Sequence, residues 1–118
     1  MRLVVTENAM QALDEVPDRV EETFWSKIED VERNLDLGAE PAAAFDKYLS
    51  GRMHPVLQMN LGRDYRAWFL EGVHLRGQDE RAVYALTVLS KSDAEELSGT
   101  IQDAVSFFHA ALERSQDP

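Results

Sequence analysis

Two cations are placed where they could hold a phosphate group. Arg66 lies in the strand-like run QMNLGRDYRAWFLEG, and Lys91 ends the run RAVYALTVLSK. An arginine guanidinium can donate two parallel hydrogen bonds to phosphate oxygens, and a lysine adds a compact positive charge. Cations that lie together on a small antiparallel sheet form a surface suited to phosphate. The pattern therefore predicts a phosphate site in the segment 55–91.

Further side chains near these two cations could complete such a site. His54 is the nearest candidate for proton transfer, because an unperturbed histidine titrates near neutral pH. Trp68 shares the strand face of Arg66 and could stack on a base, whereas Tyr65 belongs to the opposite, core-like face. The candidate cations for contacts with an RNA backbone are Lys47, Arg52 and Arg63.

The charge of the chain is unevenly distributed. The formal net charge is −10, but residues 47–92 carry seven cations and four anions, a balance of +3, so the rest of the chain carries −13. A field of carboxylates repels nucleic acid, whereas a local group of cations attracts its phosphates. The distribution indicates a mildly basic sheet inside an acidic helical shell.

Length and composition favour one globular domain over residues 1–118. The chain has 118 residues, 44% of them hydrophobic and 29% charged, which is typical of a single soluble domain. It contains no cysteine and only three scattered histidines, so we expect neither a metal nor a cofactor. No apolar run approaches the roughly 18 residues of a membrane span, and we expect a cytoplasmic protein without membrane contact.

The N-terminal part predicts a strand followed by a helical hairpin. Residues 2–5 form a short strand-like run, and Thr6 is placed to cap a first helix. Pro17 separates this helix from a second one that begins near Asp18. The second helix carries an apolar stripe at helical spacing, which predicts that it faces the core: Val20, Phe24, Ile28, Val31 and Leu35.

The central part predicts the sheet. Residues 47–50 indicate a short strand, and a main strand begins at Pro55, with Leu57, Met59 and Leu61 on one face and Gln58 and Asn60 on a solvated face. The turn at 62–64 predicts a hairpin. The strand before Lys91 is apolar on both faces, which places it centrally, and side-chain alternation puts Lys91 with Leu89, Thr87 and Ala85.

The C-terminal part predicts one long helix. Ser92 and Glu95 have the spacing of a capping box, and apolar residues continue at helical spacing to Leu112. The expected fold is α+β: a small antiparallel, mixed-edge curved sheet with an N-terminal helical hairpin and a C-terminal helix packed on it.

The segments DYRAWF and VYALTVLSK, with the order of the elements, resemble the RelE/ParE superfamily of type II toxins (RelE, HigB or phage Gp49-like branch). The order agrees over nearly the whole chain, and the likeness in sequence is confined to residues 47–92. The resemblance implies the toxin of a toxin-antitoxin pair, an endoribonuclease that cleaves messenger RNA on the ribosome without a metal, with an antitoxin protein as its partner. Arg66 matches the sheet arginine of the family, and Lys91 its later basic residue.

Two features of that family pattern are missing from this chain. RelE carries paired lysines on the strand before the arginine, where this chain reads LQMN at 57–60, and a tyrosine after the basic strand end, where this chain has Leu97. The catalytic candidates are therefore Arg66, Lys91 and His54. Two alternatives stay open: a ParE-like inhibitor of DNA gyrase, and a non-catalytic member of the fold that binds a protein partner.

Overall fold

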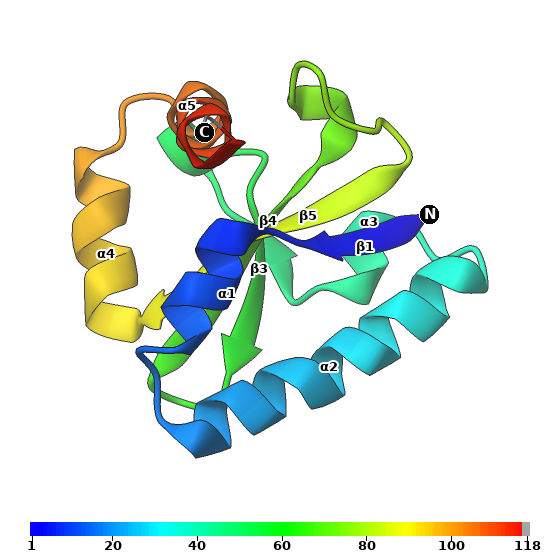
Figure 1. The fold of residues 1–118 in the computed structure, drawn as a ribbon, viewed down its shortest axis with the longest axis horizontal. Coiled ribbons are helices and arrows are strands. Elements are labelled where there is room, and N and C mark those ends of the chain that lie inside the picture. The colour runs from blue at the N-terminus through cyan, green and yellow to red at the C-terminus, as the bar shows by residue number, and fades with distance from the viewer. Residues whose placement is uncertain (117–118) are drawn as a thin grey trace.

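A five-stranded mixed sheet forms the centre of the computed structural model, which describes residues 1–116 (Figure 1). Its strands lie in the order β1-β5-β4-β3-β2; β1 runs parallel to β5, and the other neighbouring pairs are antiparallel. The α+β class, the mixed edge and the inner position of β5 are confirmed. The strands are β1 Arg2–Val5, β2 Lys47–Tyr48, β3 Leu57–Leu61, β4 Tyr65–Glu71 and β5 Ala82–Ser90.

Helices cover both faces of this sheet. Thr6 caps the first helix and the second begins at Asp18, as predicted. No helix within residues 1–116 is long and apolar enough to cross a membrane. The helices are α1 Glu7–Leu13, α2 Asp18–Asp36, α3 Pro41–Ala44, α4 Lys91–Thr100 and α5 Ala104–Gln116, with short 3-10 turns η1 Gly51–Met53 and η2 Gly72–His74.

The first face of the sheet packs against α1 and α2. The predicted apolar stripe of α2 is buried at every position, and it forms one cluster with the inward residues of β3. Complete burial of a side chain such as Phe24, which is 0% exposed, contributes roughly 1.5–3 kcal/mol. The inward face predicted for β3 is confirmed, because Leu57, Met59 and Leu61 all belong to this cluster. The opposite face is not solvated throughout as predicted: Asn60 is partly exposed, but Gln58 is buried.

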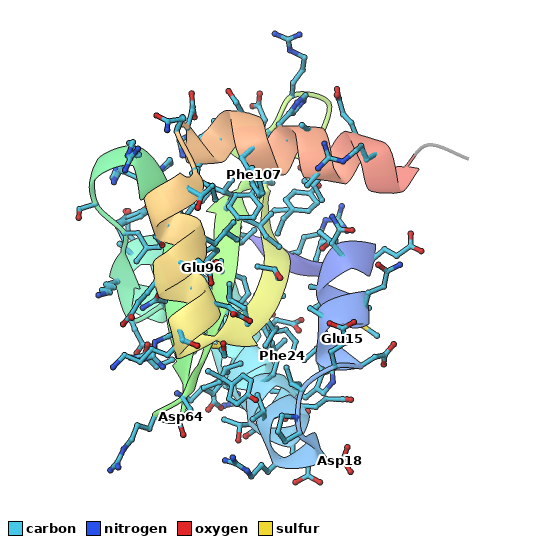
Figure 2. All side chains as sticks on the ribbon, turned by 90° about the vertical axis from the view of Figure 1, so that its left-hand side faces the viewer. Glu15, Asp18, Phe24, Asp64, Glu96 and Phe107 are labelled. Atoms are coloured by element: carbon cyan, nitrogen blue, oxygen red, sulfur yellow. The ribbon has the colours of Figure 1, made fainter. Side chains whose placement is uncertain are left out.

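The second face carries a separate hydrophobic cluster beneath α5. Trp68 and Leu70 of β4 pack there with Phe108, and the ring centroids of Trp68 and Phe108 are 6.0 Å apart in an edge-on arrangement. Figure 2 shows α5, labelled at Phe107, crossing above α4, labelled at Glu96, while α4 runs beside the strands. This face is therefore apolar at one end only, and its other end is lined by Gln58 and Asn60.

The C-terminal segment folds as two helices and not as the single helix predicted. Ile101 leaves the helix in an extended conformation and buries its side chain, and Asp103 Oδ1 accepts a hydrogen bond from the N–H of Ser106 at 3.3 Å. A straight helix over 92–112 would be about 30 Å long. The break instead lets α5 turn across the sheet and bury its apolar side on Trp68.

The start of α4 also differs from the prediction. The cap is Ser90, whose Oγ accepts from the N–H of Asp93 at 3.1 Å, so the helix begins at Lys91 and Ser92 lies inside its first turn. Likewise, β3 begins at Leu57, and Pro55 precedes it in a turn. Ser90 is also the last residue of β5, so the helix follows the strand directly.

A bulge in β5 changes which side chains share a face with Arg66. The pairing of β4 with β5 shifts between Trp68, which faces Thr87, and Phe69, which faces Ala85. The extra residue moves Ala85 to the first face, where it joins the α2 cluster. The predicted grouping of Ala85 with Thr87 and Leu89 is therefore wrong, because simple alternation does not hold across a bulge.

Replacement of Thr6 by alanine is expected to cost about 1–2 kcal/mol of unfolding free energy. Thr6 is buried, with 8% of its surface exposed. Its hydroxyl accepts a hydrogen bond from the N–H of Ala9 at 3.2 Å and donates one to the carbonyl of Ala85 at 2.7 Å. Urea denaturation measures the loss. Thr6→Ser keeps both bonds, so equal destabilisation by serine and alanine would assign the effect to the methyl group instead.

Candidate phosphate-binding cleft

A cleft of about 710 Å³ opens on the second face of the sheet, between β2, β3 and β4 on one side and α4 on the other. Figure 2 shows α4, labelled at Glu96, and the β3–β4 hairpin turn, labelled at Asp64, on the same side of the molecule. It brings together three of the predicted cations: Lys47, Arg66 and Lys91. The remaining lining residues are Asp46, Gln58, Asn60, Ala94, Glu95 and Ser98.

The pairing register of β2, β3 and β4 determines which side chains form the floor of this cleft. Lys47 pairs with Gln58 across β2 and β3, and Asn60 pairs with Arg66 across β3 and β4. Directly paired residues project from the same face of a sheet, so these four side chains form adjacent rows on the second face. The two-residue alternation of β3 thus assigns Gln58 and Asn60 to the cleft and their neighbours to the core.

Lys91 reaches the cleft from the start of α4. Its backbone N–H donates to the carbonyl of Asp64 at 2.7 Å, which ties the start of the helix to the β3–β4 turn. Arg66 is the second residue of β4, which begins just after that turn. The two cations are therefore held near one another by backbone structure and do not depend on a flexible loop.

The Arg66 guanidinium is anchored on one side. Its Nη1 donates to the carbonyls of Gly62, Arg63 and Tyr65 at 3.3, 3.2 and 2.7 Å. Its other guanidinium nitrogens have no hydrogen-bond partner in the part of the chain that the structure describes. The group is thus oriented by the turn and keeps donors for a ligand.

The cleft holds more positive than negative charge. Three cations face two carboxylates, Asp46 and Glu95, and within residues 1–116 none of these cations is in an ion pair. Asp46 Oδ2 accepts from the N–H of Asn60 at 2.6 Å, and Lys27 Nζ donates to the carbonyl of Asn60 at 2.7 Å. Unpaired cations of this kind can serve an anionic ligand.

Four other predicted site residues lie elsewhere. Trp68 is 0% exposed and its Nε1 donates to Gln58 Oε1 at 3.0 Å, so in this fold it is a core residue that presents no face to a base. Arg52 contacts Gln102 at 3.4 Å, and Arg63 is exposed at the hairpin turn. Neither arginine lines the cleft, and His54 does not line it either.

His54 belongs to a different group of side chains. Its ring centroid is 5.5 Å from that of Tyr48, and its Nδ1 is 3.3 Å from the carbonyl oxygen of Leu49. The Tyr48 hydroxyl donates to Glu71 Oε2 at 3.0 Å. Burial, and then the Glu71 carboxylate, raise the pKa of Tyr48, so this phenol stays protonated and does not act as a base at neutral pH.

Sequence reasoning did not assign Asp46, Gln58, Asn60, Glu95 or Ser98 to the site. The hairpin turn at 62–64 does carry a signal for the two amides, because it sets a register in which Asn60 faces Arg66. No comparable signal exists for Asp46, which precedes β2, or for the α4 residues. Their position depends on how α4 packs against the sheet.

Sequence comparison finds no matching family model and no matching curated protein. Among solved structures, the chain is similar to a copper-bound mutant toxin from Helicobacter pylori. The TM-score is 0.47 and the sequence identity 16%, over 79% of this chain and 97% of that one. A similarity of this size assigns no function, which has to come from the residues of the cleft.

Proposed function

We propose that this protein is a RelE/ParE-like toxin that binds the backbone of RNA in the cleft and cleaves it without a metal. The observation that carries the proposal is the gathering of Lys47, Arg66 and Lys91, from three separate segments, in a chain whose net charge is −10. An antitoxin protein would be its partner and would cover the same face.

The distribution of lysine supports a ligand at this place. The chain has only three lysines; two line the cleft, and the third, Lys27, donates to the backbone of the cleft residue Asn60. Here the lysine and arginine charges of the cleft are left unpaired, which suits an anion from outside.

The proposed reaction is attack of a ribose 2′-hydroxyl on the adjacent phosphorus, with departure of the 5′-oxygen. Arg66 and Lys91 would stabilise the charge that develops on the phosphoryl oxygens. The reaction also needs a group that accepts the proton of the 2′-hydroxyl and a group that gives a proton to the departing 5′-oxygen. Because His54 lies outside the cleft, the groups placed to accept the proton are the carboxylates of Asp46 and Glu95, and the group placed to donate one is the ammonium of Lys91.

The salt dependence of RNA binding should reflect the number of cleft cations that contact phosphates. For three phosphate contacts, the logarithm of the binding constant of a single-stranded RNA is expected to fall with a slope of about −2 against the logarithm of salt concentration. Lys91→Ala and Lys47→Ala should each make this slope shallower by about 0.7. Fluorescence anisotropy at several salt concentrations measures it.

The matched control is Arg33→Ala on the exposed side of α2, where Arg33 pairs with Asp30 at 3.0 Å. This variant removes the same charge away from the cleft and should leave the slope unchanged. An equal change in slope for the Arg33 and Lys91 variants would show that RNA does not bind in the cleft. Inhibited DNA supercoiling with intact RNA would favour the gyrase alternative.

A further inference from the structure

The buried indole of Trp68 determines which way the Gln58 amide points. An indole N–H can only donate, so the atom of Gln58 that meets it has to be the oxygen. The distance from Trp68 Nε1 to Gln58 Oε1 is 3.0 Å, and the two residues are 0% and 8% exposed. Rotation of the amide would leave a buried donor facing another donor, so the –NH₂ group is held on the opposite side.

The orientation of the Gln58 amide also bears on the orientation of the Asn60 amide. Gln58 Nε2 lies 3.5 Å from Asn60 Oδ1, a long hydrogen bond in which the Asn60 oxygen faces Gln58, and within residues 1–116 Asn60 Nδ2 has no partner. A primary amide nitrogen carries two hydrogens. Across residues 1–116, the second hydrogen of Gln58 Nε2 and both hydrogens of Asn60 Nδ2 have no protein acceptor.

We infer that Gln58 and Asn60 are ligand-binding residues that donate hydrogen bonds to phosphoryl oxygens on the floor of the cleft. Both line it beside Arg66 and Lys91, so the floor combines oriented neutral donors with positive charge. A phosphoryl group presents acceptors on every side and matches such a floor. That the phosphate belongs to RNA rests on the proposed function; a free pyrophosphate offers the same chemistry.

The test removes the amide donor of Gln58 without changing the charge of the cleft. Gln58→Met has a similar length and no amide, and it is expected to weaken binding of both inorganic pyrophosphate and a short 2′-O-methylated RNA by about ten- to a hundredfold. Since no cation is removed, the salt slope of RNA binding should stay as in the unmodified protein. Isothermal titration calorimetry measures both ligands. A change below about twofold overturns the inference.

A second variant covers the case in which Gln58→Met unfolds, since it leaves the Trp68 N–H unpaired. Asn60→Asp keeps the acceptor for Gln58, removes the Nδ2 donor and sits at a partly exposed position. Its matched control is Ser98→Asp, which adds the same charge on the α4 side of the cleft. Thermal melting shows which variants are folded. Equal loss of binding in the two aspartate variants would mean that charge alone acts, and would overturn the inference.

The same titrations separate this inference from the proposed function. Binding of pyrophosphate that depends on Gln58, with no binding of RNA, supports the donor floor and overturns the toxin proposal. Binding of RNA that needs Arg66 but neither Gln58 nor Asn60 overturns the donor floor and leaves the toxin proposal standing. Absence of binding of either ligand by the unmodified protein overturns both.

Discussion

Arg66→Ala is expected to remove the growth arrest caused by induced expression and to lower the rate of RNA cleavage by about a hundredfold or more. Loss of a single oriented donor to a developing oxyanion costs about 10²–10³ in rate. In the proposed reaction Arg66 would be such a donor, because three backbone carbonyls hold its Nη1 and its side chain lines the cleft. Cleavage of a labelled transcript measures the rate.

The controls for this experiment separate charge, orientation and folding. Arg66→Lys keeps the charge but loses the planar fork, so an intermediate rate is expected. Arg76→Ala removes an exposed arginine that does not line the cleft and should behave as the unmodified protein. Thermal melting confirms that each variant is folded. Undiminished toxicity of a folded Arg66→Ala protein would exclude Arg66 from the reaction.

Gly72→Ala is expected to destabilise the protein by about 3 kcal/mol, because overpacking against backbone cannot be relieved by a rotamer change. A methyl group on Gly72 would overlap the carbonyl oxygen of Asp79. Separation of these segments would also disturb the Asp79 N–H bond to the Tyr84 hydroxyl, 3.0 Å, and the Arg2–Asp79 ion pair, 3.1 Å. Urea denaturation measures the loss.

Gly99→Ala is the matched control for Gly72→Ala. Gly99 lies in α4, and a methyl group there meets no atom within 4 Å. Alanine in a helix is favoured over glycine, so this variant should be more stable by about 0.5–1 kcal/mol. Equal stability of the two variants would mean that the segment after β4 moves to accept the methyl group at no cost.

Prediction from sequence succeeded where the signal was local. The apolar stripe of α2 has the helical period, and all of its residues are buried. The alternation of β3 separated core residues from Gln58 and Asn60, and the Thr6 cap was recognised from the residue type and position. In each case, the backbone geometry of one element determines the outcome.

Prediction failed where two elements had to meet. The helical spacing from Leu97 to Leu112 is compatible with one helix. In the structure the helix breaks at Ile101, so that Ile101 is buried and α5 packs over Trp68. Trp68 shares the face of Arg66, as the strand period implies. It is nevertheless buried, because α5 covers that end of the face and leaves the other end open.

The sequence by itself determined most of the elements, their inward faces and the presence of Arg66 and Lys91 beside two strand ends, because these follow from short-range periods and residue types. Only the tertiary structure decided that Lys47 joins them in one cleft while His54 lies outside it. Strand register and the packing of α4 are long-range contacts, and no short segment encodes them. The same contacts orient the Gln58 amide through Trp68, ten residues along the chain.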